Sequence, residues 1–191
     1  EGIQIPVIYA EPTAPQLGRL ASEMAGSPSD SLAVFAVAGN DAQAVDQGVR
    51  DLADFLHMLG NPVGVISSGN SQSLERYLDL NYPLSILDVQ RTMAVCAEDG
   101  AAAVILALSE ETLKDDALQS VSVDVLGCGD NGLGEAEIVK SVARFGCTVG
   151  KRTHIAVRTQ ESDALASQAA AAYGQTNSSA LSLSISMELA A

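Results

Sequence analysis

Three short stretches of the chain combine residue types and spacings that suit a catalytic or ligand-binding site. In the first, the apolar run Leu32–Val37 leads through Ala38-Gly39-Asn40 into a helix that begins at Asp41. A side chain at such a strand-to-helix turn lies at a helix N-terminus, where backbone N–H groups and the helix dipole lower a thiol's pKa and stabilise an oxyanion. None of the three turn residues can act as a nucleophile. Taken alone, the turn is typical of an ordinary strand–helix connection.

The second stretch is EDGAAAVIL, residues 98–106, which we interpret as a hairpin turn followed by a buried strand. The third is YGQTNSSA, residues 173–180. A glycine followed by short polar residues can direct an amide toward a bound carbonyl, but the same pattern also fits a polar loop that caps the next element. Each stretch therefore has a plain structural interpretation when it is considered alone.

In this order, the three stretches together resemble the ketoacyl synthase III branch of the thiolase superfamily. The similar segments are VFAVAGNDAQAV, VGVISSG, EDGAAAVILA and YGQTNSSALSL, and PQLGRLASEMAG is similar to the family's helix before the nucleophile strand. The resemblance covers residues 5–110 fairly continuously and residues 170–185 as a motif. It implies a thiolase-like layered α/β/α fold with a mixed sheet, in which a thiolate accepts an acyl group from a thioester.

The resemblance assigns a role to several positions. Ala38 stands where the family has its nucleophilic Cys, and Gln175 stands where the family has Asn. His154 is the candidate for the catalytic His, although the helix IVKSVARFG aligns equally well with the helix that follows the family's His, which would make His154 an ordinary strand-edge residue. The substrate-binding positions implied are Gly39, Asn40, Gly174, Asn177, Lys151 and Arg152.

The chain departs from the family in its length as well as at its nucleophile. The family's first strands are missing before Ile3, and a further stretch is missing between Gly134 and His154. We therefore expect residues 1–191 to form a single thiolase-like domain without its N-terminal strands, and we expect a processed or truncated N-terminus.

The three cysteines offer no clear substitute nucleophile. Cys96 lies in an apolar run, where a thiol stays protonated, and Cys128 lies near Asp130, whose charge would raise a thiol's pKa. Cys147, near Lys151 and Arg152, is the best alternative thiolate, although a structural role is favoured for it. There is no CxxC or other metal-ligand spacing, so no metal site is predicted.

Half of the ten basic residues fall within 19 positions: Lys140, Arg144, Lys151, Arg152 and Arg158. In an acidic protein this patch could receive a coenzyme A phosphate or an acidic carrier domain. It could equally be a solvated helix face with scattered ion pairs.

Alternating strand and helix patterns supply the framework for these positions and indicate an α/β layered fold with a mixed sheet. Residues 68–90 are polar and irregular, and we interpret residues 93–108 as two strands joined at residues 98–100. The remaining predicted strands are Ile3–Ala10, Leu32–Val37, Val63–Ser67, Val121–Leu126 and His154–Val157, the predicted helices are Thr13–Ala25, Asp41–Leu59, Glu135–Phe145 and Ser162–Ala172, and Ser179–Leu189 is either strand or helix.

Composition narrows the class of partner. The net charge is −14, with 24 acidic against ten basic residues, which argues against nucleic acid and against an anionic membrane surface. The hydrophobic fraction of 47% is typical of globular proteins. The sequence shows no signal-peptide pattern and no apolar run of membrane-spanning length. With an odd number of cysteines, the expectation is a cytoplasmic protein.

Three functional readings follow. The favoured one is a non-catalytic ketosynthase-like subunit, in fatty acid or polyketide biosynthesis, that binds acyl-CoA or acyl-carrier thioesters and forms a homodimer or a heterodimer with a ketosynthase-like subunit. It would hold no tightly bound cofactor, with coenzyme A or phosphopantetheine as the substrate carrier. The second is a ketoacyl synthase III-like acyltransferase whose nucleophile was mutated or replaced. The third is an unrelated α/β domain that binds a small metabolite at the turns of Gly39 or Gly127.

Overall fold

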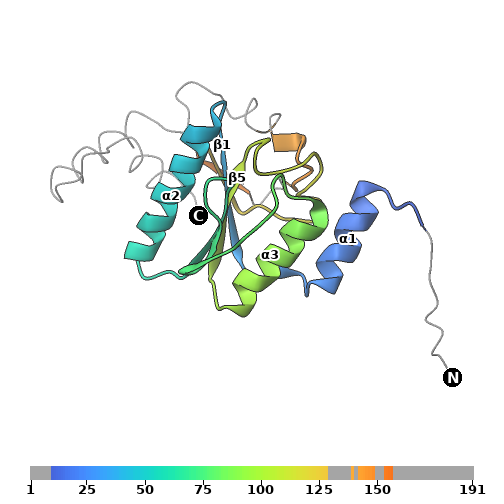
Figure 1. Cartoon of the computed structure of the whole chain (residues 1–191), viewed down its shortest axis with the longest axis horizontal. Coiled ribbons are helices and arrows are strands. Elements are labelled where there is room, and N and C mark those ends of the chain that lie inside the picture. Colours follow the sequence, from blue (N-terminus) through green and yellow to red (C-terminus); the bar gives the residue numbers. More distant parts are fainter. Residues whose placement is uncertain (1–9, 129–138, 140–141, 149–152, 157–191) are drawn as a thin grey trace.

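The computed structural model describes residues 10–128, 139, 142–148 and 153–156 (Figure 1). Within these residues the strands form one sheet of seven, in the order β4-β3-β2-β5-β1-β6-β7. The strands are β1 (Ala33–Ala38), β2 (Val63–Ile66), β3 (Gln72–Ser73), β4 (Arg76–Tyr77), β5 (Ala103–Leu108), β6 (Val125–Cys128) and β7 (His154–Ala156). The helices are α1 (Ala14–Met24), the short 3-10 helix η1 (Pro28–Asp30), α2 (Ala42–Met58) and α3 (Ile86–Glu98).

Five of the strands run parallel. β1 pairs with β5 on one side and with β6 on the other, β5 pairs with β2, and β6 pairs with β7, all in parallel. β3 and β4 form an antiparallel hairpin that extends the sheet beyond β2. The predicted α/β class with a mixed sheet is therefore confirmed.

Helices cover both faces of the sheet, with α2 on one side of β1 and β5, and α3 and α1 on the other (Figure 1). Successive side chains of β1 point to opposite faces of the sheet and contribute to the apolar core on each face. Phe35 and Val37 pack with the apolar stripe of α2, whereas Val34, Ala36 and Ala38 pack with α3 and with the segment that follows β5. β1 is thus buried from both sides, as its uninterrupted apolar sequence predicts.

The connections from β1 and β5 leave the sheet toward opposite faces. After β1 the chain enters α2, while after β5 it enters a segment whose Leu113, Leu118 and Val121 belong to the core on the α3 side. In parallel α/β sheets, neighbouring strands whose connections diverge in this way leave a crevice at their carboxyl ends. The structure therefore places such a crevice between β1 and β5.

The predicted helices at residues 13–25 and 41–59 are confirmed, as are the strands at 32–37, 63–67 and 154–157. Asp41 caps α2 by accepting hydrogen bonds from the backbone N–H groups of Gln43 and Ala44, each at 3.3 Å. This cap fixes the start of α2 three residues after β1 ends, so the predicted strand–turn–helix arrangement is present.

Of the two strands predicted within residues 93–108, the second is confirmed as the buried strand β5, whereas the first is wrong because residues 93–98 form the second half of α3. Ser85 caps this helix, with Asp88 accepting a hydrogen bond from the Ser85 backbone N–H. Val89, Met93 and Cys96 form its buried face, at helical spacing. The predicted hairpin turn at residues 98–100 is instead the helix C-terminus, completed by Gly100 at a φ of 92°.

Two other expectations need correction. Residues 68–90 are not irregular throughout, since they contain the β3–β4 hairpin and the start of α3. The strand predicted at Val121–Leu126 lies instead at Val125–Cys128, because Val121 and Val123 hydrogen-bond to Thr148 and not to β1. The predictions for residues 3–10, 162–172 and 179–189 lie outside the described residues, and the helix predicted at 135–145 is described only at residues 139 and 142–145.

Close packing between α3 and β2 yields a prediction. A Cβ added at Gly64 would lie 2.5 Å from the Cys96 Sγ and 3.1 Å from its Cβ. We expect Gly64→Ala to lower the free energy of unfolding by about 1–3 kcal/mol through overpacking, measured by urea denaturation.

The double variant Gly64→Ala/Cys96→Ala supplies the control. The double variant removes the Sγ that the new Cβ would meet. Its decrease in the free energy of unfolding should therefore be at least about 0.5 kcal/mol smaller than the sum of the decreases in the two single variants. Strictly additive losses would contradict the packing of α3 on β2.

Candidate functional site

The turn that the sequence singled out lies at the carboxyl edge of the parallel strands. A hollow of about 350 Å³ opens there between the ends of β1 and β5, and we call it the carboxyl-edge hollow. Gly39 and Asn40, two of the positions predicted to bind substrate, line it from the β1 side, and Ser109 lines it from the β5 side. Its other lining residues are Ala42, Leu108, Glu110, Glu111, Val142, Arg144 and Phe145. Its size lies at the lower end of the range for small-molecule sites.

Ala38 does not line this hollow. It is the last residue of β1, only 2% of its surface is exposed, and it belongs to the apolar core on the α3 side together with Leu108, its partner on β5. A side chain at position 38 therefore points into the core and not toward the turn. A thiol placed there would be desolvated, and desolvation raises a thiol's pKa.

The charges around the carboxyl-edge hollow do not favour an anion. Arg144 is the one basic residue among the described lining residues, and its guanidinium is already bonded to the carboxylates of Glu110 and Asp115, the latter at 2.5 Å. The bonds to Asp115 and Glu110 raise the pKa of Arg144 above its ordinary value. The N-terminal amides of α2 are likewise occupied by Asp41. An uncharged polar ligand suits this setting better than a phosphate does.

A cluster of hydroxyl groups lies beside the hollow, where β2 and β5 end. Ser109 Oγ donates to Thr112 Oγ1 at 3.0 Å, and the backbone N–H of Ser68 donates to the same Thr112 oxygen at 3.0 Å. These bonds tie the loop after β2 to the segment after β5. They fix the position of Ser109, which sequence reasoning missed because the ladder order was not known.

Ser67, in the same cluster, donates a hydrogen bond to the Asp46 carboxylate on α2, and Ser71 donates to the Ser67 carbonyl at 3.2 Å. Tyr82 donates to Ser71 Oγ at 2.5 Å, and burial raises the pKa of this tyrosine. No bond in the described cluster involves His57 or His154. The Ser67–Asp46 pair therefore fastens α2 to the end of β2.

His154 lies away from Ala38. It begins β7 and pairs with Val125 on β6, which in turn is level with Phe35 on β1. Ala38 is three residues further along β1, and β7 is two strands away, so the two backbones lie about 14 Å apart at ordinary sheet spacings. His154 is exposed, and its backbone N–H donates to the Asp124 carbonyl at 2.7 Å. The structure therefore does not bring Ala38 and His154 together.

The other predicted positions lie outside the described residues: Gln175, Gly174, Asn177, Lys151 and Arg152. Of the cysteines, Cys96 is buried, and burial raises its pKa to about 11. Burial also raises the pKa of Cys147, whose Sγ donates to the Val142 carbonyl at 3.6 Å. Neither of these two is a thiolate at neutral pH, which agrees with the structural roles expected for them.

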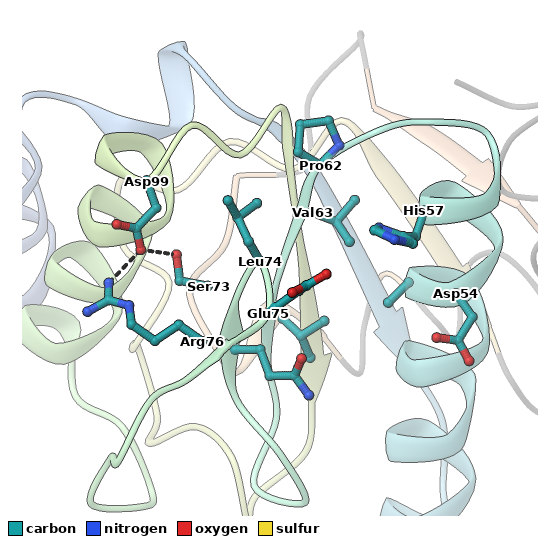
Figure 2. Close-up of a pocket in the computed structure, with 12 residues that line it drawn as sticks. Asp54, His57, Pro62, Val63, Ser73, Leu74, Glu75, Arg76 and Asp99 are labelled. Carbon is teal, nitrogen blue, oxygen red and sulfur yellow. Dashed lines mark hydrogen bonds and ion pairs between the residues drawn. The ribbon is translucent and has the colours of Figure 1, made fainter.

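A second, larger depression of about 660 Å³ lies between α2 and the β3–β4 hairpin, and we call it the hairpin groove (Figure 2). Val63 and Val65 of β2 form its floor, and His57 and Asp54 of α2 face Glu75 of the hairpin across it (Figure 2). This groove could not be predicted from the sequence, because nothing in the sequence places residues 72–76 beside α2.

No protein-family model matches the chain, and no curated protein matches it either. Within the described residues no three His, Cys, Asp or Glu side chains gather as metal ligands would. No helix in the described part of the chain has the length and apolar character needed to cross a membrane.

The burial of position 38 predicts its reactivity. In Ala38→Cys, the new thiol should react with iodoacetamide at least tenfold more slowly than the thiol of Asn40→Cys, because Asn40 is exposed in the same turn. Peptide mapping by mass spectrometry separates these sites from the native cysteines. Equal rates, or faster alkylation at position 38, would mean that the turn activates a thiol as in a condensing enzyme.

Proposed function

We propose that this chain binds the pantetheine arm of an acyl thioester without forming a covalent intermediate, at the carboxyl-edge hollow. The observation that carries the proposal is the position of the hollow. It lies where the connections of two parallel strands diverge, and the turn that the sequence associates with thioester chemistry forms one wall of it.

Three features support binding without acyl transfer. Position 38 carries Ala and its side chain is buried in the core. His154 is about 14 Å from it, by the sheet spacings. The thiols of Cys96 and Cys147 have raised pKa values. A ketosynthase-like partner subunit needs none of these groups for its own role, which supports the reading of a non-catalytic member of the thiolase superfamily.

The chemistry of the hollow favours the neutral part of the carrier. Pantetheine is an uncharged chain with two amides, and the hollow offers the backbone of Gly39 and the polar residue Ser109 beside apolar Leu108 and Phe145. Glu110 and Glu111 outnumber Arg144 among the described lining residues, so the phosphates of coenzyme A would have to bind elsewhere. Lys151 and Arg152 remain the residues proposed for them.

A second candidate is an α/β domain, unrelated to ketosynthases, that binds another small polar metabolite in the same hollow. One observation favours it: residues 98–100, which resemble a strand-to-strand turn of the family, end a helix here. Both candidates use the same hollow, and they differ in the ligand that it accepts.

A substitution that fills the hollow tests the site. Ala42 lines the hollow at the start of α2, whereas its neighbour Gln43 is exposed and does not. We expect Ala42→Leu to weaken binding of S-acetylpantetheine at least tenfold, measured by isothermal titration calorimetry. Gln43→Leu, the matched control, should bind within twofold of the wild type.

The outcomes separate the candidates. Intact-mass measurement after incubation with acetyl-CoA should show no acetyl adduct, and an adduct would support the acyltransferase alternative. If neither S-acetylpantetheine nor acetyl-CoA binds at millimolar concentration, the thioester proposal is wrong. Equal binding by Ala42→Leu and wild type would place the ligand outside the hollow.

A further inference from the structure

The hairpin groove is a pocket at the edge of the sheet, and it shares no lining residue with the carboxyl-edge hollow. Its wall on one side is α2, with Ala53, Asp54 and His57, and its wall on the other is the hairpin, with Gln72, Leu74 and Glu75 (Figure 2). Its volume of about 660 Å³ lies well within the range of small-molecule sites.

The groove has an apolar floor because one helix cannot cover the whole sheet. Among the described residues, α2 packs on β1, β5 and β2, and no other helix covers this face where the hairpin extends it. Val63 and Val65 lie at the bottom of the groove with only 7% of their surface exposed, and Pro62 and Leu74 line the groove beside them. Such a floor can hold the apolar body of a ligand, because apolar surface gains free energy when it is removed from water.

Three carboxylates line the groove, those of Asp54, Glu75 and Asp99, together with one guanidinium, that of Arg76. The side chains of Asp54, Glu75 and His57 make no hydrogen bond or ion pair with other described residues. The nearest cationic side chain, Arg76, turns away from them toward Asp99, whose carboxylate it meets at 2.5 Å (Figure 2). Ser73 donates to the same carboxylate at 2.5 Å, and the bonds from Ser73 and Arg76 lower the pKa of Asp99.

The carboxylates of Asp54 and Glu75 thus lie on opposite walls above an apolar floor, while Arg76 forms an ion pair with Asp99. We propose that the hairpin groove binds a small organic cation, with an ammonium group on an apolar body. The body rests on Val63, Val65 and Leu74, and the ammonium lies between Asp54 and Glu75. The overall charge of −14 attracts any cation, but the apolar floor selects one that carries hydrophobic surface.

A pair of probes of equal shape tests this proposal on the full chain. 4-Phenylbutylamine carries the ammonium, and 4-phenyl-1-butanol is its neutral counterpart. In ¹H–¹⁵N correlation spectra, the amine should shift the amide signals of residues 53–57, 63–65 and 72–76, and the alcohol should bind at least tenfold more weakly. Shifts scattered over the acidic surface, or equal affinity for amine and alcohol, would overturn the proposal.

Charge-neutral variants isolate the contribution of the rim. Asp54→Asn/Glu75→Gln should weaken binding of the amine at least tenfold and leave binding of the alcohol within twofold. Asp79→Asn/Glu98→Gln removes the same charge from exposed positions outside the groove and should bind the amine as the wild type does. Equal losses in both double variants would reduce the effect to general charge attraction and contradict a specific site.

Discussion

The burial of strand β1 on both faces is the constraint on which the rest of the structure depends. Its side chains alternate between the core beneath α2 and the core beneath α3, and its backbone pairs with β5 and β6. Asp124 secures the start of this arrangement, since its carboxylate accepts a hydrogen bond from the backbone N–H of Val34 at 2.8 Å. Because β1 can move toward neither face, the turn that follows it is held at a fixed place on the sheet edge.

The carboxyl-edge hollow and the hairpin groove follow from the way this sheet is covered. The carboxyl-edge hollow exists because the connections after β1 and β5 diverge to opposite faces. The hairpin groove exists because α2 stops short of the hairpin that widens the sheet. The two differ in chemistry: the first has hydroxyl and backbone groups with a neutralised arginine, while the second has an apolar floor under unpaired carboxylates. They are therefore suited to different ligands.

The elements with clear local signals could be predicted from the sequence. The apolar positions of α2 recur at helical spacing after the capping Asp41, and β1 is a short apolar run before a glycine turn. The helix α3 was missed because residues 93–97 form a short apolar run before Glu98-Asp99-Gly100, and apolar density alone does not separate a buried helix from a buried strand. The cap at Ser85 was the signal that could have identified it.

The site could be predicted only in part, for a physical reason. The turn at Gly39 and Asn40 is local, so its place at a strand end was readable, whereas the direction of the Ala38 side chain depends on the register of β1 with β5. The distance of about 14 Å between the backbones of Ala38 and His154 depends likewise on the order of β1, β6 and β7 in the sheet. Strand order and register arise from contacts between residues far apart in the chain, which spacing along the sequence does not encode.

The most direct test of the central claim is a crystal structure of the chain grown with S-acetylpantetheine. Our account predicts ligand density in the carboxyl-edge hollow, against the backbone of Gly39 and the side chain of Ser109, with no covalent bond to the protein. Density bonded to residue 154 or to a cysteine, or an empty hollow with the ligand bound elsewhere, would contradict it.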